Sequence, residues 1–157
     1  MGEERAASLS VLLQQHLRTA IRQGDGWMPF DRFMSMALYE PGQGYYANGS
    51  LKFGPMPGSG SDFVTAPELS PLFGRALAVQ VAQALAACGS TQIWEFGAGS
   101  GALAAQLLTA LSDSVTGYHI VDLSAQLRAR QVETLQAWRG RVHWHDHLPQ
   151  TLDGVVL

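Results

Sequence analysis

The stretch Gln92-Ile93-Trp94-Glu95-Phe96-Gly97-Ala98-Gly99-Ser100-Gly101 passes from an apolar strand candidate into a glycine-rich turn. A helical pattern over residues 100–111 follows directly. Glycines at this point let the backbone turn tightly and approach a ligand, and the free N–H groups at the helix start attract a negative group. The stretch therefore predicts a nucleotide or nucleoside cofactor turn at residues 95–101. The plainer alternative is a tight strand-to-helix connection that holds no ligand.

Strand and helix patterns alternate along the chain after this turn. The apolar spacing predicts strands over residues 117–121, 142–144 and 154–157, and a helix over residues 124–138. Alternation at this spacing is the signature of βαβ units with right-handed crossovers in a parallel sheet. The predicted fold class is therefore α/β.

Two short helices and a loop precede the α/β part. Apolar residues between Leu9 and Ile21 recur at helical spacing, and Pro29 opens a second helix that ends before Gly42. Between residues 49 and 61, nine of thirteen residues are Gly, Pro or Ser, which predicts a mobile loop. A third helix over residues 71–87 is apolar nearly all round, so we expect it to be largely buried.

Composition excludes several classes of protein. The chain has 157 residues, enough for one domain with a sizeable core, and its 46% of hydrophobic residues excludes a disordered tail. A net charge of -3 favours neither nucleic acid nor an anionic membrane surface as a partner. No uninterrupted run of about 18 apolar residues is present, and the N-terminus has no signal or transit pattern. These features predict a protein without a membrane span.

The single cysteine and the tryptophans are interpreted as packing residues. Cys88 cannot form an internal disulfide, which favours a reducing, cytosol-like compartment, and we expect it to be a small buried hydrophobe. Trp27, Trp94 and Trp138 are expected in the core or at an interface.

Two acidic residues follow the next two strands. Asp122 ends the strand over residues 117–121, where a carboxylate can accept hydrogen bonds from both hydroxyls of a ribose. It could instead cap the next helix, but Ser124 can serve as that cap, which would leave Asp122 free. Asp146 follows the third strand and is placed to meet the exocyclic amine of an adenine, although turn aspartates are common.

Two cofactors fit this layout. The spacing Gly97-x-Gly99-x-x-Ala102 satisfies the loose dinucleotide pattern, so the glycines alone leave NAD open. Three details favour S-adenosylmethionine instead. Glu95 stands two positions before the first glycine, the third glycine is Gly101, and more than ninety residues precede the motif.

The histidines near the end of the chain carry a weaker signal. His143, His145 and His147 alternate, and with Asp146 they approach a metallohydrolase pattern that is short by one residue. We expect no metal site there and interpret these residues as solvated histidines of an edge strand.

Four motifs carry a resemblance to a known family. They are Phe33-Met34-x-x-Ala37-Leu38-Tyr39-x-Pro41-x-x-Gly44-Tyr45-Tyr46, Asp62-Phe63-Val64-Thr65-Ala66-Pro67-Glu68-Leu69-Ser70-Pro71-Leu72-Phe73-Gly74, the glycine turn, and Trp144-His145-Asp146. Through them the chain is similar, over nearly its whole length, to the MidA-like family of S-adenosylmethionine-dependent methyltransferases. That family includes the mitochondrial complex I assembly factor that acts as a protein arginine methyltransferase. One departure is Ser61, where the family usually has glycine.

The resemblance implies a fold, a cofactor and an acceptor. The fold is Rossmann-like, of class I methyltransferase type, with strand order 3-2-1-4 and an N-terminal helical extension. The cofactor is S-adenosylmethionine, and the acceptor is arginine of a protein, such as a respiratory complex I subunit. A non-catalytic assembly factor on the same fold and an NAD-dependent oxidoreductase are the alternatives.

The resemblance also implies roles for the segment over residues 62–74, which would lie over the cofactor pocket as a lid. Thr65 and Pro67 would then join the cofactor site, and Asp62 and Glu68 are candidate catalytic carboxylates. Further groups on the acceptor side are expected beyond Leu157.

Three parts of the chain follow from these patterns. Residues 1–48 form a helical cap, residues 49–70 a mobile loop and lid segment, and residues 71–157 the N-terminal half of the cofactor-binding domain. Because the predicted strands are fewer than a class I methyltransferase sheet uses, we expect an N-terminal fragment truncated after the fourth strand. It would be weak or inactive alone and could self-associate through that bare edge. The expected location is a bacterial cytoplasm rather than a mitochondrial matrix.

Overall fold

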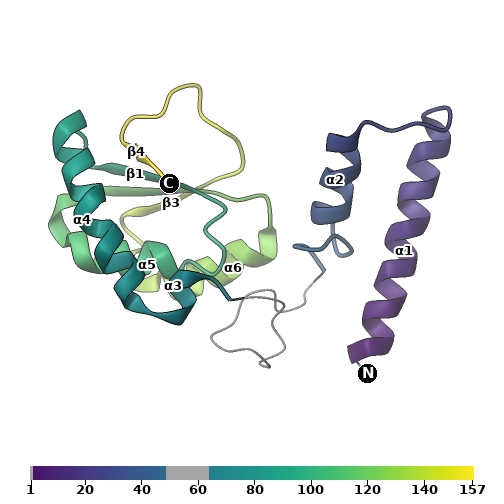
Figure 1. Ribbon diagram of the computed structural model, residues 1–157, viewed down its shortest axis with the longest axis horizontal. Coiled ribbons are helices and arrows are strands. Elements are labelled where there is room, and N and C mark those ends of the chain that lie inside the picture. The colour runs from purple at the N-terminus through teal and green to yellow at the C-terminus, as the bar shows by residue number, and fades with distance from the viewer. Residues whose placement is uncertain (1, 49–63) are drawn as a thin grey trace. The chain divides into compact units, whose positions relative to one another are not determined.

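The chain consists of two compact units, each considered by itself. The computed structural model describes residues 2–48 and 64–157, and the units are Met1–Ser50 and Leu51–Leu157 (Figure 1). The predicted mobile loop and Asp62 lie outside the described residues.

The N-terminal unit is built from two helices, α1 (Gly2–Gln23) and α2 (Phe30–Tyr39). After α2 the chain folds back on the helix, because the N–H groups of Tyr45 and Tyr46 donate to the carbonyls of Ala37 and Leu38 at 2.9 and 2.8 Å. Gly44 is buried at this contact, where a Cβ atom would lie 2.7 Å from the Leu38 carbonyl oxygen. The Gly44-Tyr45-Tyr46 motif therefore closes the end of α2.

Trp27 is not a core residue of this unit. It follows the turn at the end of α1 and its side chain is 70% exposed, so of the two expected places, core or interface, the core is wrong for Trp27 and the interface stays a prediction.

The second unit is a four-stranded parallel sheet with helices along one side (Figure 1). The sheet order is β3-β2-β1-β4, which confirms the α/β class and the 3-2-1-4 order. The elements in chain order are α3 (Ala66–Leu69), α4 (Pro71–Cys88), β1 (Gln92–Phe96), α5 (Ala102–Leu111), η1 (Ser112–Ser114), β2 (Gly117–Val121), α6 (Ala125–Thr134), η2 (Gln136–Trp138), β3 (Val142–His145) and β4 (Val155–Val156).

The two faces of the sheet carry different side chains. Ile93 pairs with Tyr118, and Tyr118 with Val142, and all three side chains are buried in the core with residues of α4 and α5. Side chains alternate along a strand, so Trp94 and His119 lie on the opposite face. Their rings stack there at 4.1 Å. The helices therefore cover the aliphatic face.

Helix α4 is buried along one stripe only. Its buried residues are Gly74, Ala78, Val81 and Leu85, at the i, i+4, i+7, i+11 spacing of one helix face. Leu72 is 65% exposed, and Cys88 at the end of the helix is also exposed. The expectations of a largely buried helix and a buried cysteine are therefore wrong, because α4 packs against α5 and the sheet on one side only.

The length and mean hydropathy of α4, 18 residues and 1.2, reach those of a membrane-spanning helix. Core helices of globular domains pass the same test, and the buried stripe of α4 packs in the core of this unit. Arg75 further interrupts its apolar surface. We therefore assign α4 to the α/β layer.

The crossing of α4 and α5 depends on Gly74. A Cβ atom at this position would lie 2.4 Å from the Cβ of Gln106 on α5, a distance that no rotamer change can relieve. We expect Gly74→Ala to lower the free energy of unfolding by about 1–3 kcal/mol, since overpacking outweighs the gain of up to about 1 kcal/mol in helix propensity. Urea denaturation would measure it.

Gly140→Ala is the matched control, because nothing lies within 4 Å of a Cβ atom at Gly140. Its stability should stay within about 0.5 kcal/mol of the parent protein. If Gly74→Ala were as stable as Gly140→Ala, the close crossing would be wrong.

Candidate functional site

The candidate site lies where β1 ends. β1 pairs with β2 on one side and with β4 on the other. The strand order therefore reverses at β1, because the chain adds β2 and β3 on one side of it and then crosses to add β4 on the other. In open parallel sheets ligands bind at the carboxyl ends of the strands at such a switch point. The glycine turn over residues 97–101 begins there.

The backbone of the turn requires its glycines. Gly97, Gly99 and Gly101 have φ angles of +70°, +56° and +84°, a region that L side chains rarely adopt. Gly97 N–H donates to the Val121 carbonyl at 3.0 Å, which ties the turn to the end of β2. These angles explain why the glycines recur at every second position.

The turn also presents unpaired donors. Among the residues that the structure describes, no protein acceptor pairs with the backbone N–H groups of Ala98, Gly99 and Ser100. Consecutive free N–H groups before a helix form a site for a carboxylate or another electronegative ligand group. The residues present therefore fit the polar end of a cofactor.

A pocket of about 180 Å³ lies against the turn. One wall comes from the segment around α3 and the other from the end of β1, the turn and the start of α5. The lining residues are Thr65, Pro67, Glu68, Glu95, Gly97, Ala98, Gly99, Ser100, Ala102 and Leu103. The structure thus brings together most of the predicted cofactor residues and one candidate catalytic carboxylate.

Glu68 joins the two walls of the pocket. Its carboxylate accepts a hydrogen bond from the hydroxyl of Ser100 in the glycine turn. That hydroxyl in turn accepts from the N–H of Ala102 at 3.3 Å. The α3 segment is therefore fastened to the turn through a carboxylate that also faces the pocket.

Gln106 on α5 holds the α3 segment in place. Its side-chain amide donates to the Pro67 carbonyl at 2.7 Å and accepts from Gly74 N–H at 2.9 Å. The sequence pattern did not predict this role. The available signal was a single glutamine within the apolar helix Ala102–Leu111.

Glu95 is a buried acid in the pocket wall, only 6% exposed. Burial raises the pKa of its carboxyl to about 7; the hydrogen bond from Tyr118 opposes the shift, and the charge of Asp122 adds to it. The Tyr118 hydroxyl donates to Glu95 Oε2 at 2.7 Å. Glu95 can therefore exchange a proton near neutral pH.

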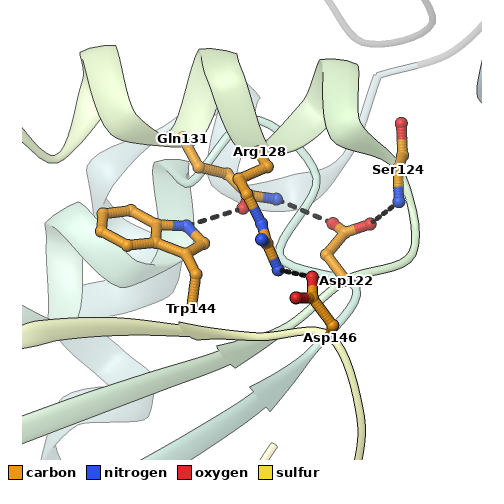
Figure 2. Close-up of polar contacts among 6 residues, drawn as sticks. All are labelled: Asp122, Ser124, Arg128, Gln131, Trp144 and Asp146. Carbon is orange, nitrogen blue, oxygen red and sulfur yellow. Dashed lines mark hydrogen bonds and ion pairs between the residues drawn. The ribbon is translucent and has the colours of Figure 1, made fainter.

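Asp122 directly follows β2 and does not line the pocket, and Figure 2 shows its contacts with Ser124 and Gln131. Its side chain is buried, with one oxygen accepting from Ser124 N–H at 2.9 Å and the other from Gln131 Nε2 at 2.7 Å. Ser124 caps α6 by accepting from Leu127 N–H, as expected. The expectation that this cap leaves Asp122 free is wrong, because both its oxygens have partners. Each oxygen still has a second lone pair for a ligand.

Asp146 is also outside the pocket lining and pairs with Arg128. Its side chain is 73% exposed, and Oδ1 lies 2.6 Å from the Arg128 guanidinium on α6 (Figure 2). Gly101 likewise lies outside the lining and is the N-cap of α5.

The histidines form a cluster on the other face of the sheet. His119 Nδ1 lies 3.0 Å from His145 Nε2, and the His143 ring stacks on His119 at 5.1 Å. Burial, with the charges of His143 and His145, lowers the pKa of His119 to about 4. His145 is thus not simply solvated, since a neighbouring strand supplies its partner.

Comparison with known proteins assigns the family. A family model described as "Putative S-adenosyl-L-methionine-dependent methyltransferase" matches residues 76–157, just over half of the chain. The chain belongs to this family. Its cofactor is S-adenosylmethionine, which decides against NAD.

Solved structures resemble the chain closely. A methyl transferase candidate from Burkholderia thailandensis, crystallised with S-adenosyl-homocysteine, is 54% identical with a TM-score of 0.85, over 96% of this chain and 41% of that one. A second Burkholderia thailandensis structure is 49% identical with a TM-score of 0.77, over 96% and 39%.

A curated relative comes from an animal. The mitochondrial protein arginine methyltransferase NDUFAF7 of Danio rerio is 28% identical over 90% of this chain and 35% of its own length. The chain thus spans about a third of the length of the curated relatives it matches.

The buried Glu95 predicts a pH-dependent contribution to stability. Because the folded pKa of about 7 exceeds the ordinary value of 4.5, this contribution is full below pH 4.5 and is lost as pH rises through 7. Glu95→Gln lacks this pH-dependent contribution. The difference in unfolding free energy, variant minus parent, should therefore rise by about 1–3 kcal/mol from pH 5 to pH 8. Urea denaturation at both pH values would measure the gain.

Glu133→Gln is the matched control, because Glu133 lies on α6 and is exposed. Subtracting the parent curve removes other titrations, including that of His119. A Glu95→Gln difference that stays constant between the two pH values would contradict the raised pKa.

Proposed function

We propose that the protein binds S-adenosylmethionine in the pocket at the end of β1 and transfers its methyl group to arginine of a protein. The pocket carries this proposal, because it joins the free N–H groups of the turn to Glu68 from a distant part of the chain. The relatives named as protein arginine methyltransferases support the choice of acceptor.

Each end of the cofactor has a candidate partner. The free N–H groups at Ala98, Gly99 and Ser100 suit its carboxylate, and the remaining lone pairs of Asp122 suit the ribose hydroxyls. Asp146 is the candidate for the adenine amine and would exchange part of its contact with Arg128.

The cofactor supplies a methyl group on a sulfonium, whose neutral leaving group needs neither metal nor covalent enzyme intermediate. The protein's task is positioning and removal of a proton. An arginine acceptor is protonated in water, so carboxylates must orient it. Glu68 and Asp62 are the candidates for that role, and Glu95, with its pKa near 7, can hold a proton close to the turn.

The wider biological setting is part of the same proposal. The two bacterial structures share about half of their aligned residues with this chain, compared with 28% for the Danio rerio relative, which supports a bacterial cytoplasmic location. The resemblance to the MidA-like family extends the proposed acceptor to a respiratory complex I subunit.

Calorimetry with S-adenosylhomocysteine tests the cofactor site. We expect the protein to bind it, and Asp122→Asn to bind it about tenfold or more weakly, because a charge-assisted hydrogen bond to the ribose is lost. Asp113→Asn is the matched control, since the Asp113 side chain is 96% exposed. Absence of binding by the parent protein, or equal affinity in Asp122→Asn, would refute this site.

Methyl transfer needs its own measurement on the full-length protein. Labelled S-adenosylmethionine is incubated with an arginine-rich peptide and with the same peptide carrying lysine at each arginine. We expect label only in the arginine peptide. Cofactor and peptide binding without any incorporation would favour the non-catalytic assembly factor.

A further inference from the structure

One fully buried side chain connects the turn after β1, the end of β2 and β3. Gln131 on α6 is 0% exposed. Its Nε2 donates to the Gly99 carbonyl at 3.1 Å and to Asp122 Oδ2 at 2.7 Å, and its Oε1 accepts from Trp144 Nε1 at 3.1 Å. Figure 2 shows Gln131 between Trp144 and Asp122.

These contacts fix the orientation of the amide. The indole N–H of Trp144 can only donate, so it must face the amide oxygen of Gln131. The NH₂ group then faces two acceptors, and both of its hydrogens are used. The flipped amide would set its oxygen against the Gly99 carbonyl and the Asp122 carboxylate, so one orientation is allowed.

The Gln131 amide orients two groups beside the pocket. It holds the Gly99 carbonyl on the α6 side, and because a trans peptide places C=O and N–H on opposite sides, the Ser100 N–H points away from α6. It also fixes Asp122, whose other oxygen is held by Ser124 N–H. One side chain thus sets both a turn donor and the carboxylate.

Burying an amide at this position costs desolvation free energy, so its presence calls for a functional reason. Burying a glutamine removes water from both of its polar ends, and its hydrogen bonds must offset that loss. A methionine of similar volume would fill the same space without that desolvation. Stability alone therefore does not call for an amide here.

We propose that Gln131 is a positioning residue that holds Asp122 in the arrangement that binds the ribose diol of the cofactor and, to a lesser extent, holds the Gly99–Ser100 peptide beside the cofactor's carboxylate. This inference rests on the proposed function and specifies which part of the ligand depends on α6. Gln131 does not line the pocket, so it acts through Asp122 and the turn.

The test compares two ligands on three proteins. The ligands are S-adenosylhomocysteine and its 2′,3′-dideoxy analogue, which lacks the ribose hydroxyls. The proteins are the parent, Gln131→Met, and the control Gln136→Met, which makes the same change at an exposed position on η2. Calorimetry gives each affinity, and thermal unfolding verifies that each variant is folded.

A ribose-specific loss is expected. Gln131→Met should bind S-adenosylhomocysteine about tenfold or more weakly than the parent, because Asp122 loses its charge-assisted partner. The dideoxy analogue should lose clearly less affinity on the same substitution, at most about threefold, because it lacks the hydroxyls that Asp122 binds and, of the contacts that Gln131 orients, keeps only that between its carboxylate and the turn. Gln136→Met should match the parent for both ligands.

The other outcomes separate the two proposals. Equal losses for both ligands would mean general damage to the site and would overturn the positioning role, as would an unchanged affinity for S-adenosylhomocysteine. A parent protein that binds neither ligand would overturn the proposed function, and this inference with it. If Gln131→Met does not fold, Gln131→Asn takes its place, because its shorter amide cannot span the same three partners, and the same ribose-specific loss is expected.

Discussion

The backbone of the turn from β1 into α5 is the constraint on which the site depends. The chain must pass from strand to helix within five residues, and three of these have positive φ angles. That conformation leaves consecutive N–H groups without protein partners in the described part of the chain. Within the turn, Gly101 N–H donates to the Ala98 carbonyl at 2.8 Å, and the further contacts that hold the turn come from neighbouring elements. Gln131 from α6 binds its carbonyl side, and Glu68 from α3 binds its Ser100 hydroxyl.

Two glutamines therefore have similar roles, because each holds a segment that lines the pocket. Gln106 fastens the α3 segment through Pro67, and Gln131 fastens the turn and Asp122. A neutral amide suits this task, because it can donate and accept at once without adding a charge beside Glu95. The acidic residues that face the ligand can then keep lone pairs for it.

Helices and strands with regularly spaced apolar residues could be predicted from the sequence. Contacts between side chains of different helices and strands could not. The strand candidate before the glycine turn, predicted over residues 92–96, and the strand predicted over residues 117–121 have the bounds of β1 and β2, because short apolar runs between turn residues identify strands well. The helix predicted over residues 124–138 divides into α6 and η2, since local periodicity does not distinguish an α-helix from the 3₁₀ turn that follows it. Glu68 and Ser100 were both chosen as site residues, but their direct contact depends on the crossing of α4 and α5 at Gly74.

The candidate acidic residues show the same contrast between position, which the sequence predicts, and contacts, which it does not. The position of Asp122 at the end of β2 followed from the strand pattern, whereas its partner Gln131 lies nine residues later on a helix where a glutamine ordinarily indicates solvent exposure. Helix α4 illustrates the converse case. Apolar residues all round it suggested burial on every side, yet within the described part of the chain its fully buried residues are confined to the stripe from Gly74 to Leu85. Burial depends on which faces the tertiary structure covers, and periodicity cannot supply that information.

The two faces of the sheet carry groups whose proton affinities are displaced in opposite directions. The helix-covered face holds Glu95, whose pKa is raised to about 7, and the opposite face holds His119, whose pKa is lowered to about 4. Between pH 4.5 and 6.5 the folded chain therefore keeps a proton on Glu95 that the unfolded chain releases, and lacks one on His119 that the unfolded chain binds. The two displacements cancel, so folding in this range exchanges almost no net proton with the buffer through this pair. Near pH 6 both groups are neutral, so the buried carboxyl of Glu95 carries no charge and the partly exposed ring of His119 adds none on the opposite face.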